Sequence, residues 1–176
     1  MPEAKEVIEA REKTNDREYF LKIVREMPLL IEWANDEIRD DKEVVLEAVK
    51  KDSGALEFSS ERLKDDKEVA LEAVSKAGWT TCYLSERLKD DKEVILKAAE
   101  NDGQVLYFAS QALRDDKDVV LASVSNKPII IKYASLRLRQ DKEVATVAVK
   151  KGKKKVIDFL AEDLKKDEDL LKLLEE

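Results

Sequence analysis

The string Asp40-Asp41-Lys42-Glu43-Val44 opens a pattern that decides the fold, because the same string returns at Asp65 and at Asp90. It returns once more at Asp115, with Asp118 in place of the glutamate. The step is 25 residues, and the sixth frame, which begins at Gln140, carries one extra residue. Recurrence at a fixed period of this length is typical of stacked helical units. The six frames are 15–39, 40–64, 65–89, 90–114, 115–139 and 140–165.

Each frame predicts two short helices. Either aspartate of the opening pair can accept hydrogen bonds from the first helical turn, and Glu43 follows Asp40 by three residues, as in a capping box. Apolar residues then occupy frame positions 5, 6, 7, 9 and 10, a stripe wide enough for an enclosed helix. A turn containing Gly or Pro comes next. The second helix places apolar residues at positions 17, 19 and 24, such as Leu56, Phe58 and Leu63.

The frames therefore predict an all-α fold, an α-solenoid of six two-helix repeats in a single domain over residues 1–176. Helices of about 10 residues bury too little surface to fold alone, so the repeats must stack and the ends need caps. Residues 1–14 are expected to cap the N-terminal end, with Ala4, Val7 and Ile8 facing inward. Residues 166–176 are expected to form a C-terminal capping helix with a leucine-rich face.

Residues 90–114 carry the clearest resemblance to a known family. They read Asp-Asp-Lys-Glu-Val-Ile-Leu, then a turn with Gly103, then Leu-Tyr-Phe-Ala-Ser and a closing Leu-Arg. This unit resembles a domain-of-unknown-function family with tandem Asp-[Asp]-[Lys/Arg]-Glu-Val-Val-Leu-x-Ala-Val units. The resemblance covers about residues 15–165, and it implies a helical repeat fold and no activity. The regular segment 167–176 would also suit a de novo designed repeat protein, although the repeats vary more than those of a consensus design.

The composition argues against catalysis and metal binding. The chain has no histidine, which is the most common general base and zinc ligand, and its one cysteine is Cys82. The acidic pairs lack the alternating oxygen ligands of a calcium loop. We therefore expect no enzyme, no metal site and no cofactor. No apolar run reaches the length of a membrane span, and the first residues form no apolar signal segment, so the expected location is cytoplasmic.

A candidate partner-binding surface follows from frame positions 15, 18 and 22, which vary between frames while the core positions recur. On one continuous helix these positions share a face. Solenoids bind partners along extended faces, and aromatic side chains are favoured anchors. The alternative is that these side chains pack against loops or against the adjacent repeat. The candidate residues are Trp79, Cys82, Gln104, Tyr107, Ile129, Lys132 and Leu136.

The densest positive cluster lies in the turn of the last frame. It is a candidate contact for phosphates or an acidic partner, and the alternative is a solvated turn. The net charge of −7 and the absence of interleaved aromatic residues weigh against nucleic-acid binding. The candidate anion contacts are Lys150, Lys151, Lys153, Lys154 and Lys155.

The sequence therefore predicts a non-catalytic scaffold with a protein or peptide partner and no membrane association. Two alternatives stay open at this point. The chain would then be a structural or designed repeat protein without a ligand, or a weak electrostatic nucleic-acid binder that uses the Lys150–Lys155 turn. The sequence does not indicate an oligomeric state.

Overall fold

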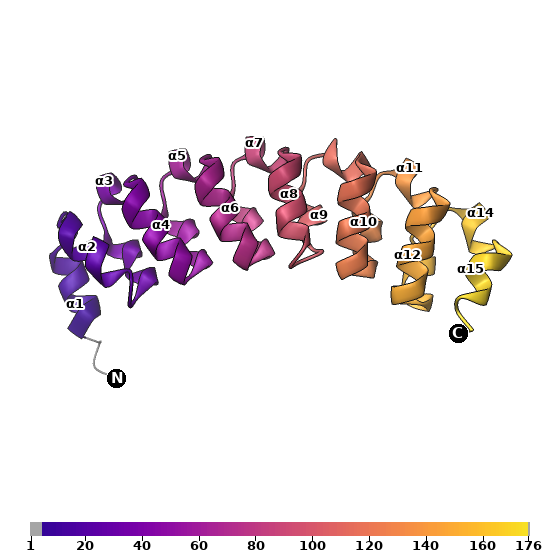
Figure 1. Cartoon of the computed structure of the whole chain (residues 1–176), viewed down its shortest axis with the longest axis horizontal. Helices are drawn as coiled ribbons and strands as arrows, with labels where there is room; N and C mark the ends of the chain where they lie inside the picture. Colours follow the sequence, from indigo (N-terminus) through magenta and orange to yellow (C-terminus); the bar gives the residue numbers. More distant parts are fainter. Residues whose placement is uncertain (1–4, 176) are drawn as a thin grey trace. The chain divides into compact units, whose positions relative to one another are not determined.

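The computed structural model describes residues 5–175, which form α-helices and 3-10 helices without a β-strand. The chain divides into unit 1 (residues 1–85) and unit 2 (residues 86–176), and each unit is a stack of helical repeats (Figure 1). The predicted all-α repeat fold is thereby confirmed within each unit, whereas the single domain stays a prediction. Residues 1–4 and Glu176, in the predicted caps, lie outside the described residues.

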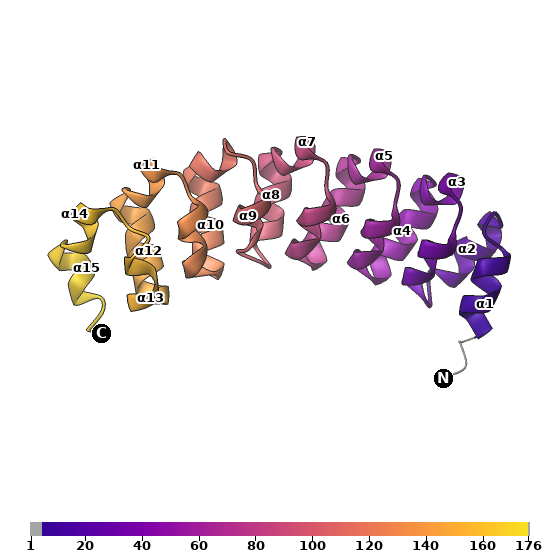
Figure 2. The same ribbon diagram turned by 180° about the vertical axis from the view of Figure 1, so that it is seen from behind.

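Unit 1 places its longer helices side by side and its four-residue helices along one edge (Figures 1 and 2). A complete repeat comprises a long α-helix, a six-residue 3-10 helix and a four-residue α-helix. The elements are α1 Lys5–Glu12, α2 Arg17–Ile23, η1 Pro28–Trp33, α3 Asp36–Arg39, α4 Lys42–Lys51, η2 Ser53–Phe58, α5 Glu61–Lys64, α6 Lys67–Lys76 and η3 Gly78–Tyr83.

Unit 2 has the same plan with local differences. A short α-helix stands in its first 3-10 position, and the insertion in the last frame lengthens the long helix there. Among the residues that the structure describes, no helix of either unit is long and apolar enough to cross a membrane. The elements are α7 Glu86–Lys89, α8 Lys92–Ala99, α9 Val105–Phe108, η4 Leu113–Asp115, α10 Lys117–Asn126, η5 Pro128–Tyr133, α11 Leu136–Arg139, α12 Lys142–Gly152, α13 Lys154–Ile157, α14 Glu162–Lys165 and α15 Glu168–Lys172.

The second helix of the frame is not continuous, contrary to the prediction. In the second repeat it breaks at Ser59 and Ser60, whose ψ angles of 162° and 157° are extended. The Ser60 hydroxyl oxygen accepts a hydrogen bond of 3.2 Å from the backbone N–H of Leu63 and so caps α5. Serine side chains compete with helical hydrogen bonds and favour such caps. Position 22 therefore starts a new helix rather than continuing the face of positions 15 and 18.

The core follows the predicted positions closely. Leu56 at position 17 and Leu63 at position 24 are fully buried, as is Thr81, the polar exception at position 17. Thr81 is tolerated there because its hydroxyl donates a 2.7 Å hydrogen bond to the carbonyl of Gly78. Buried polar groups are usually satisfied in this way.

The caps pack differently from the prediction. Val7 is half-buried and Ile8 is 45% exposed, so the inward orientation of Ile8 is wrong, and Ala10 is the buried residue of α1. In the C-terminal cap Leu170 is buried whereas Leu171 is exposed. Helix α1 packs against η1, and α15 packs against α12 and α14, so part of each helix still faces solvent.

Candidate interaction surfaces

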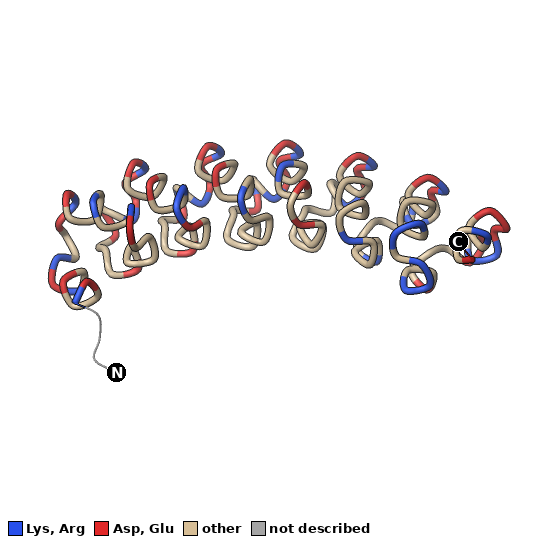
Figure 3. The backbone as a smooth tube through the Cα atoms, turned by 60° about the horizontal axis from the view of Figure 1, so that its bottom comes forward, with Lys and Arg blue, Asp and Glu red and all other residues tan. Residues whose placement is uncertain are grey.

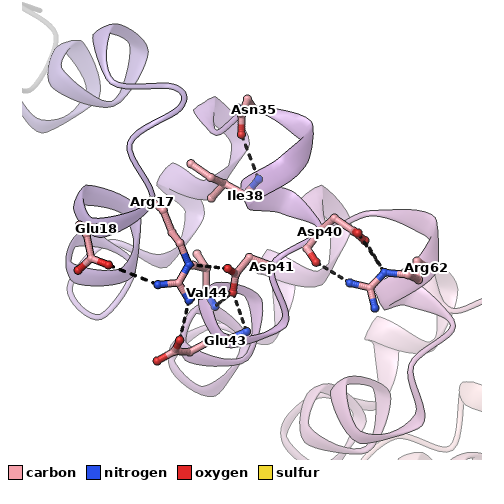
Figure 4. Close-up of polar contacts among 9 residues, drawn as sticks. All are labelled: Arg17, Glu18, Asn35, Ile38, Asp40, Asp41, Glu43, Val44 and Arg62. Atoms are coloured by element: carbon pink, nitrogen blue, oxygen red, sulfur yellow. Dashed lines mark hydrogen bonds and ion pairs between the residues drawn. The ribbon is translucent and has the colours of Figure 1, made fainter.

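The two aspartates that open the second to fifth frames have different structural roles, as the second frame shows. Asp41 caps α4, because its Oδ1 accepts a 3.0 Å hydrogen bond from the backbone N–H of Glu43. Asp40 instead accepts a hydrogen bond from the Ser60 hydroxyl. It also accepts one of 2.9 Å from Arg62 Nε, which Figure 4 shows. The interpretation that helix capping explains both acids is therefore wrong. The first aspartate joins the end of one short helix to the start of the next.

The predicted capping box is also absent. Glu43 stands two residues after the true cap, Asp41, and a capping box requires three. The backbone N–H of Asp41 donates to the carbonyl of Ile38 at 3.0 Å. The Glu43 carboxylate accepts from Arg17 Nη2 of the preceding repeat at 2.6 Å (Figure 4).

A cation at frame position 3 links each of several repeats to the next. In unit 2, Lys117 Nζ lies 2.8 Å from both Asp141 Oδ2 and Glu143 Oε2. Lys42 makes the equivalent pair of contacts in unit 1. The acidic pairs are thus occupied by contacts between repeats. Within the described part of the chain, no group of three or more His, Cys, Asp or Glu residues is arranged to hold a metal ion.

In unit 1 the varied positions expose an indole. Trp79 lies on η3, is 45% exposed and meets the ring of Tyr83 edge to face, with centroids 5.9 Å apart. The Tyr83 hydroxyl donates a 2.8 Å hydrogen bond to Glu57 of the preceding repeat. This hydrogen bond raises the pKa of Tyr83 to about 12. Cys82, one turn from Trp79, is half-buried.

In unit 2 the varied positions expose a tyrosine. Tyr107 on α9 is 51% exposed, and its ring centroid lies 5.0 Å from that of Tyr133 in the following repeat. Lys132 is exposed on η5, with its Nζ 4.8 Å from the centroid of the Tyr133 ring. Gln104 is exposed and Ile129 is half-buried. The aromatic ring at position 107 is therefore held by its neighbours and still faces solvent.

The structure does not place all seven candidates on a common helical face. Leu136 is 60% exposed, but it begins α11, which is separated from η5 by the extended residues Ala134 and Ser135. The prediction that positions 15, 18 and 22 share one face is wrong for position 22. Trp79 and Cys82 belong to unit 1 and the other five candidates to unit 2, so each set is described by itself.

The first repeat contains an apolar site that the sequence analysis missed. Leu29, at frame position 15, is exposed and lines a pocket of about 240 Å³ with Met27, Pro28, Leu30 and Asp52. The signal was present in the sequence, since Leu29 occupies the same frame position as Trp79. The first repeat departs most from the frame, so its varied positions are harder to recognise in the sequence.

The five candidate lysines lie around the turn between α12 and α13. Lys150 and Lys151 end α12, Lys153 links the helices, and Lys154 and Lys155 begin α13. The chain is blue along this turn in Figure 3. All except Lys150 line a groove of about 590 Å³. The other lining residues are Pro128, Ile129, Gly152, Val156 and Leu174.

Two of the groove lysines are fixed by backbone contacts. Lys151 Nζ donates a 2.5 Å hydrogen bond to the carbonyl of Ser125, and Lys153 Nζ donates one of 2.9 Å to the carbonyl of Leu173. Lys153 also has a φ of 51°, which is the left-handed region that non-glycine residues rarely adopt. The turn is thus built by specific contacts.

Comparison with known proteins identifies a family for this chain. A family model described as a domain of unknown function (DUF4116) matches residues 16–64, 66–114 and 116–165. Each match spans two of the 25-residue repeats seen in the sequence. No curated protein and no solved structure matches the chain. The three matches together cover most of the chain.

Proposed function

Because the chain belongs to the family of the domain of unknown function DUF4116, we propose a function from its surfaces: a non-catalytic helical-repeat scaffold that binds a protein or peptide. One observation carries the proposal. The contacts that join the repeats recur along the chain, whereas the exposed residues at positions 15 and 18 differ and include Trp79 and Tyr107. A constant frame with a varied exposed face is the arrangement that repeat proteins use for binding.

The 3-10 helices favour this use of positions 15 and 18. In a 3-10 helix, side chains three residues apart lie in line. Trp79 and Cys82 on η3 are such a pair, as are Ile129 and Lys132 on η5. Trp79 packs against Tyr83, so its indole is already ordered before a partner binds. It therefore offers contact area at a small cost in side-chain conformational entropy. Aromatic residues in this state are frequent anchors of protein interfaces.

The titratable groups support a non-catalytic reading. Hydrogen bonds to Asp141 and Glu143 raise the pKa of Lys117, and hydrogen bonds from Ser135 and Arg137 lower the pKa of Asp115. These shifts arise in contacts that join the repeats. Shifted pKa values that have such a structural cause are not evidence for an active site.

Affinity capture with surface variants tests the proposal. The tagged chain would be compared with Trp79→Ala and Tyr107→Ala, and with Leu171→Ala as a control, because Leu171 is an exposed apolar residue outside positions 15 and 18. We expect a protein that the parent and the control retain and that at least one aromatic variant loses. If no protein shows that pattern, a structural repeat protein without a ligand becomes the better account.

A further inference from the structure

The groove between α12 and α13 differs from the rest of the surface in how its charges are balanced. At frame position 3, lysines such as Lys117 and Lys142 each lie within 2.9 Å of two carboxylates. Lys154 and Lys155, which line the groove, have no ion-pair partner among residues 5–175. In a chain of net charge −7, this groove is a local excess of unbalanced positive charge.

The groove also has an apolar floor. Pro128 and Ile129 come from η5, Val156 from α13 and Leu174 from the segment after α15, and all of them line it together with the lysines. Pro128, Ile129 and Leu174 are half-buried, so each is held by packing and still offers apolar surface, whereas Val156 is fully buried and offers none to a ligand. A ligand for this groove needs negative charge at its edges and apolar surface between the charges.

We infer that this groove binds an acidic peptide segment of a partner protein, with carboxylates at Lys154 and Lys155 and an apolar side chain on the floor formed by Pro128, Ile129 and Leu174. A nucleic acid fits less well, because the lining contains no aromatic side chain on which a base could stack. Electrostatic complementarity of this kind guides partners and sets their specificity. The inference shares with the proposed function only that the partner is a protein.

A synthetic peptide tests the groove without an identified partner. A fluorescent peptide with a leucine between two pairs of glutamates would be titrated with the full chain and followed by anisotropy. The companion probes are the same peptide with serine for leucine, and a single-stranded oligonucleotide of similar charge. The groove variant is Lys154→Glu with Lys155→Glu. The control is Lys22→Glu with Lys51→Glu, two exposed lysines outside the groove lining that change the net charge equally.

We expect the groove variant to weaken peptide binding by about tenfold or more, and the control variant by no more than about twofold. The serine peptide should bind roughly threefold or more weakly than the leucine peptide, because the apolar floor loses its contact. Circular dichroism would confirm that both variants keep the helical fold of the parent.

Three results would overturn the inference: no binding by the parent, equal weakening by the groove and control variants, or an oligonucleotide that binds as well as the leucine peptide. The last would indicate a general polyanion site. The variant Tyr107→Ala distinguishes failure of the groove proposal from failure of the proposed function. Tyr107 does not line the groove, so its removal should leave peptide binding unchanged. If the parent chain binds the peptide but captures no partner, the proposed function fails and the groove proposal stands. If it captures a partner but does not bind the peptide, the groove proposal fails.

Discussion

Lys153 is a lysine in a backbone conformation that favours glycine, with φ 51° and ψ −140°. Such a residue costs about 1–3 kcal/mol. We predict that Lys153→Gly is more stable than Lys153→Ala by about 1 kcal/mol, although glycine normally destabilises a chain relative to alanine. Both variants lack the amine that donates to Leu173, so the comparison isolates the backbone. Urea unfolding measures it, and greater stability of the alanine variant would contradict the conformation.

Gly103 and Gly54 have similar places in their frames and different surroundings. A Cβ added to Gly103 would lie 2.3 Å from the backbone carbonyl oxygen of Ser123, so the packed repeats would have to move. At Gly54 the nearest atom is a side-chain oxygen of Asp52 at 3.1 Å. We predict that Gly103→Ala loses about 1–3 kcal/mol of unfolding free energy and that Gly54→Ala changes it by less than about 1 kcal/mol. Equal losses would argue against the close approach at Gly103.

Residue roles were predictable where they follow from one helix alone. The cap at Asp41 and the buried leucines fall into this class. The role of Asp40 does not, because its partners Ser60 and Arg62 are about one repeat further along the chain. Only the three-dimensional stacking of repeats shows which residues lie opposite each other.

Helix α14 lacks the side-chain N-cap that α5 and α11 have. Ser135 caps α11 by accepting a 3.2 Å hydrogen bond from the backbone N–H of Leu138, and its hydroxyl donates to Asp115. At the equivalent place α14 has Ala161, with no side-chain cap. We predict that Ser135→Ala loses about 1–2 kcal/mol of unfolding free energy and that Ala161→Ser gains up to about 1 kcal/mol. Thermal unfolding measures both, and a neutral Ser135→Ala would refute the capping role.

The long first helix of each frame could be predicted from the sequence, whereas the break in the second helix could not. The long helices combine an aspartate cap with a regular apolar stripe, as in α4. In the second segment the apolar residues at positions 17 and 24, seven residues apart, also fit one continuous helix. The structure breaks it because the hydroxyl of Ser60 forms a local cap and its backbone N–H donates to Arg39 of the preceding repeat at 3.0 Å. That second partner lies in another repeat, which helical periodicity does not describe.

At the scale of the whole molecule, the repeat contacts predict a loss of stability in acid. Burial alone would raise the pKa of Asp41, but hydrogen bonds from Arg17 and from the N–H groups of α4 outweigh it and lower the pKa. The hydrogen bonds from Ser135 and Arg137 lower the pKa of Asp115. In the unfolded chain the pKa of an aspartate is about 4. A carboxyl whose pKa is lower in the folded state stabilises the fold at pH values above about 4. This stabilisation is lost as the pH falls from there through the pKa of the folded state.

Urea unfolding at pH 7, 4 and 3 checks this prediction. The midpoint should fall between pH 4 and pH 3, because the unfolded chain then binds more protons than the folded one. Since equivalent aspartates recur in both units, many small contributions share the effect. A midpoint that is the same at pH 7 and pH 3 would show that these contacts contribute little.

The candidate surfaces were predictable in part. Exposure of Trp79 and Tyr107 followed from frame positions that vary, and the lysine turn was visible as a run of charge. The groove itself was not, because it combines Lys154 with Ile129 from the preceding repeat and Leu174 from the segment after α15. The order of residues in the chain does not show which of these side chains meet.

The free energy of unfolding of Tyr107→Ala tests the central claim most directly, namely that the varied positions face a partner and do not hold the stack. Tyr107 is half exposed, and its buried neighbour Leu106 provides the reference. We predict a loss of no more than about 1.5 kcal/mol for Tyr107→Ala, against about 2–5 kcal/mol for Leu106→Ala. A loss for Tyr107→Ala as large as that for Leu106→Ala would make it a core residue and contradict the account.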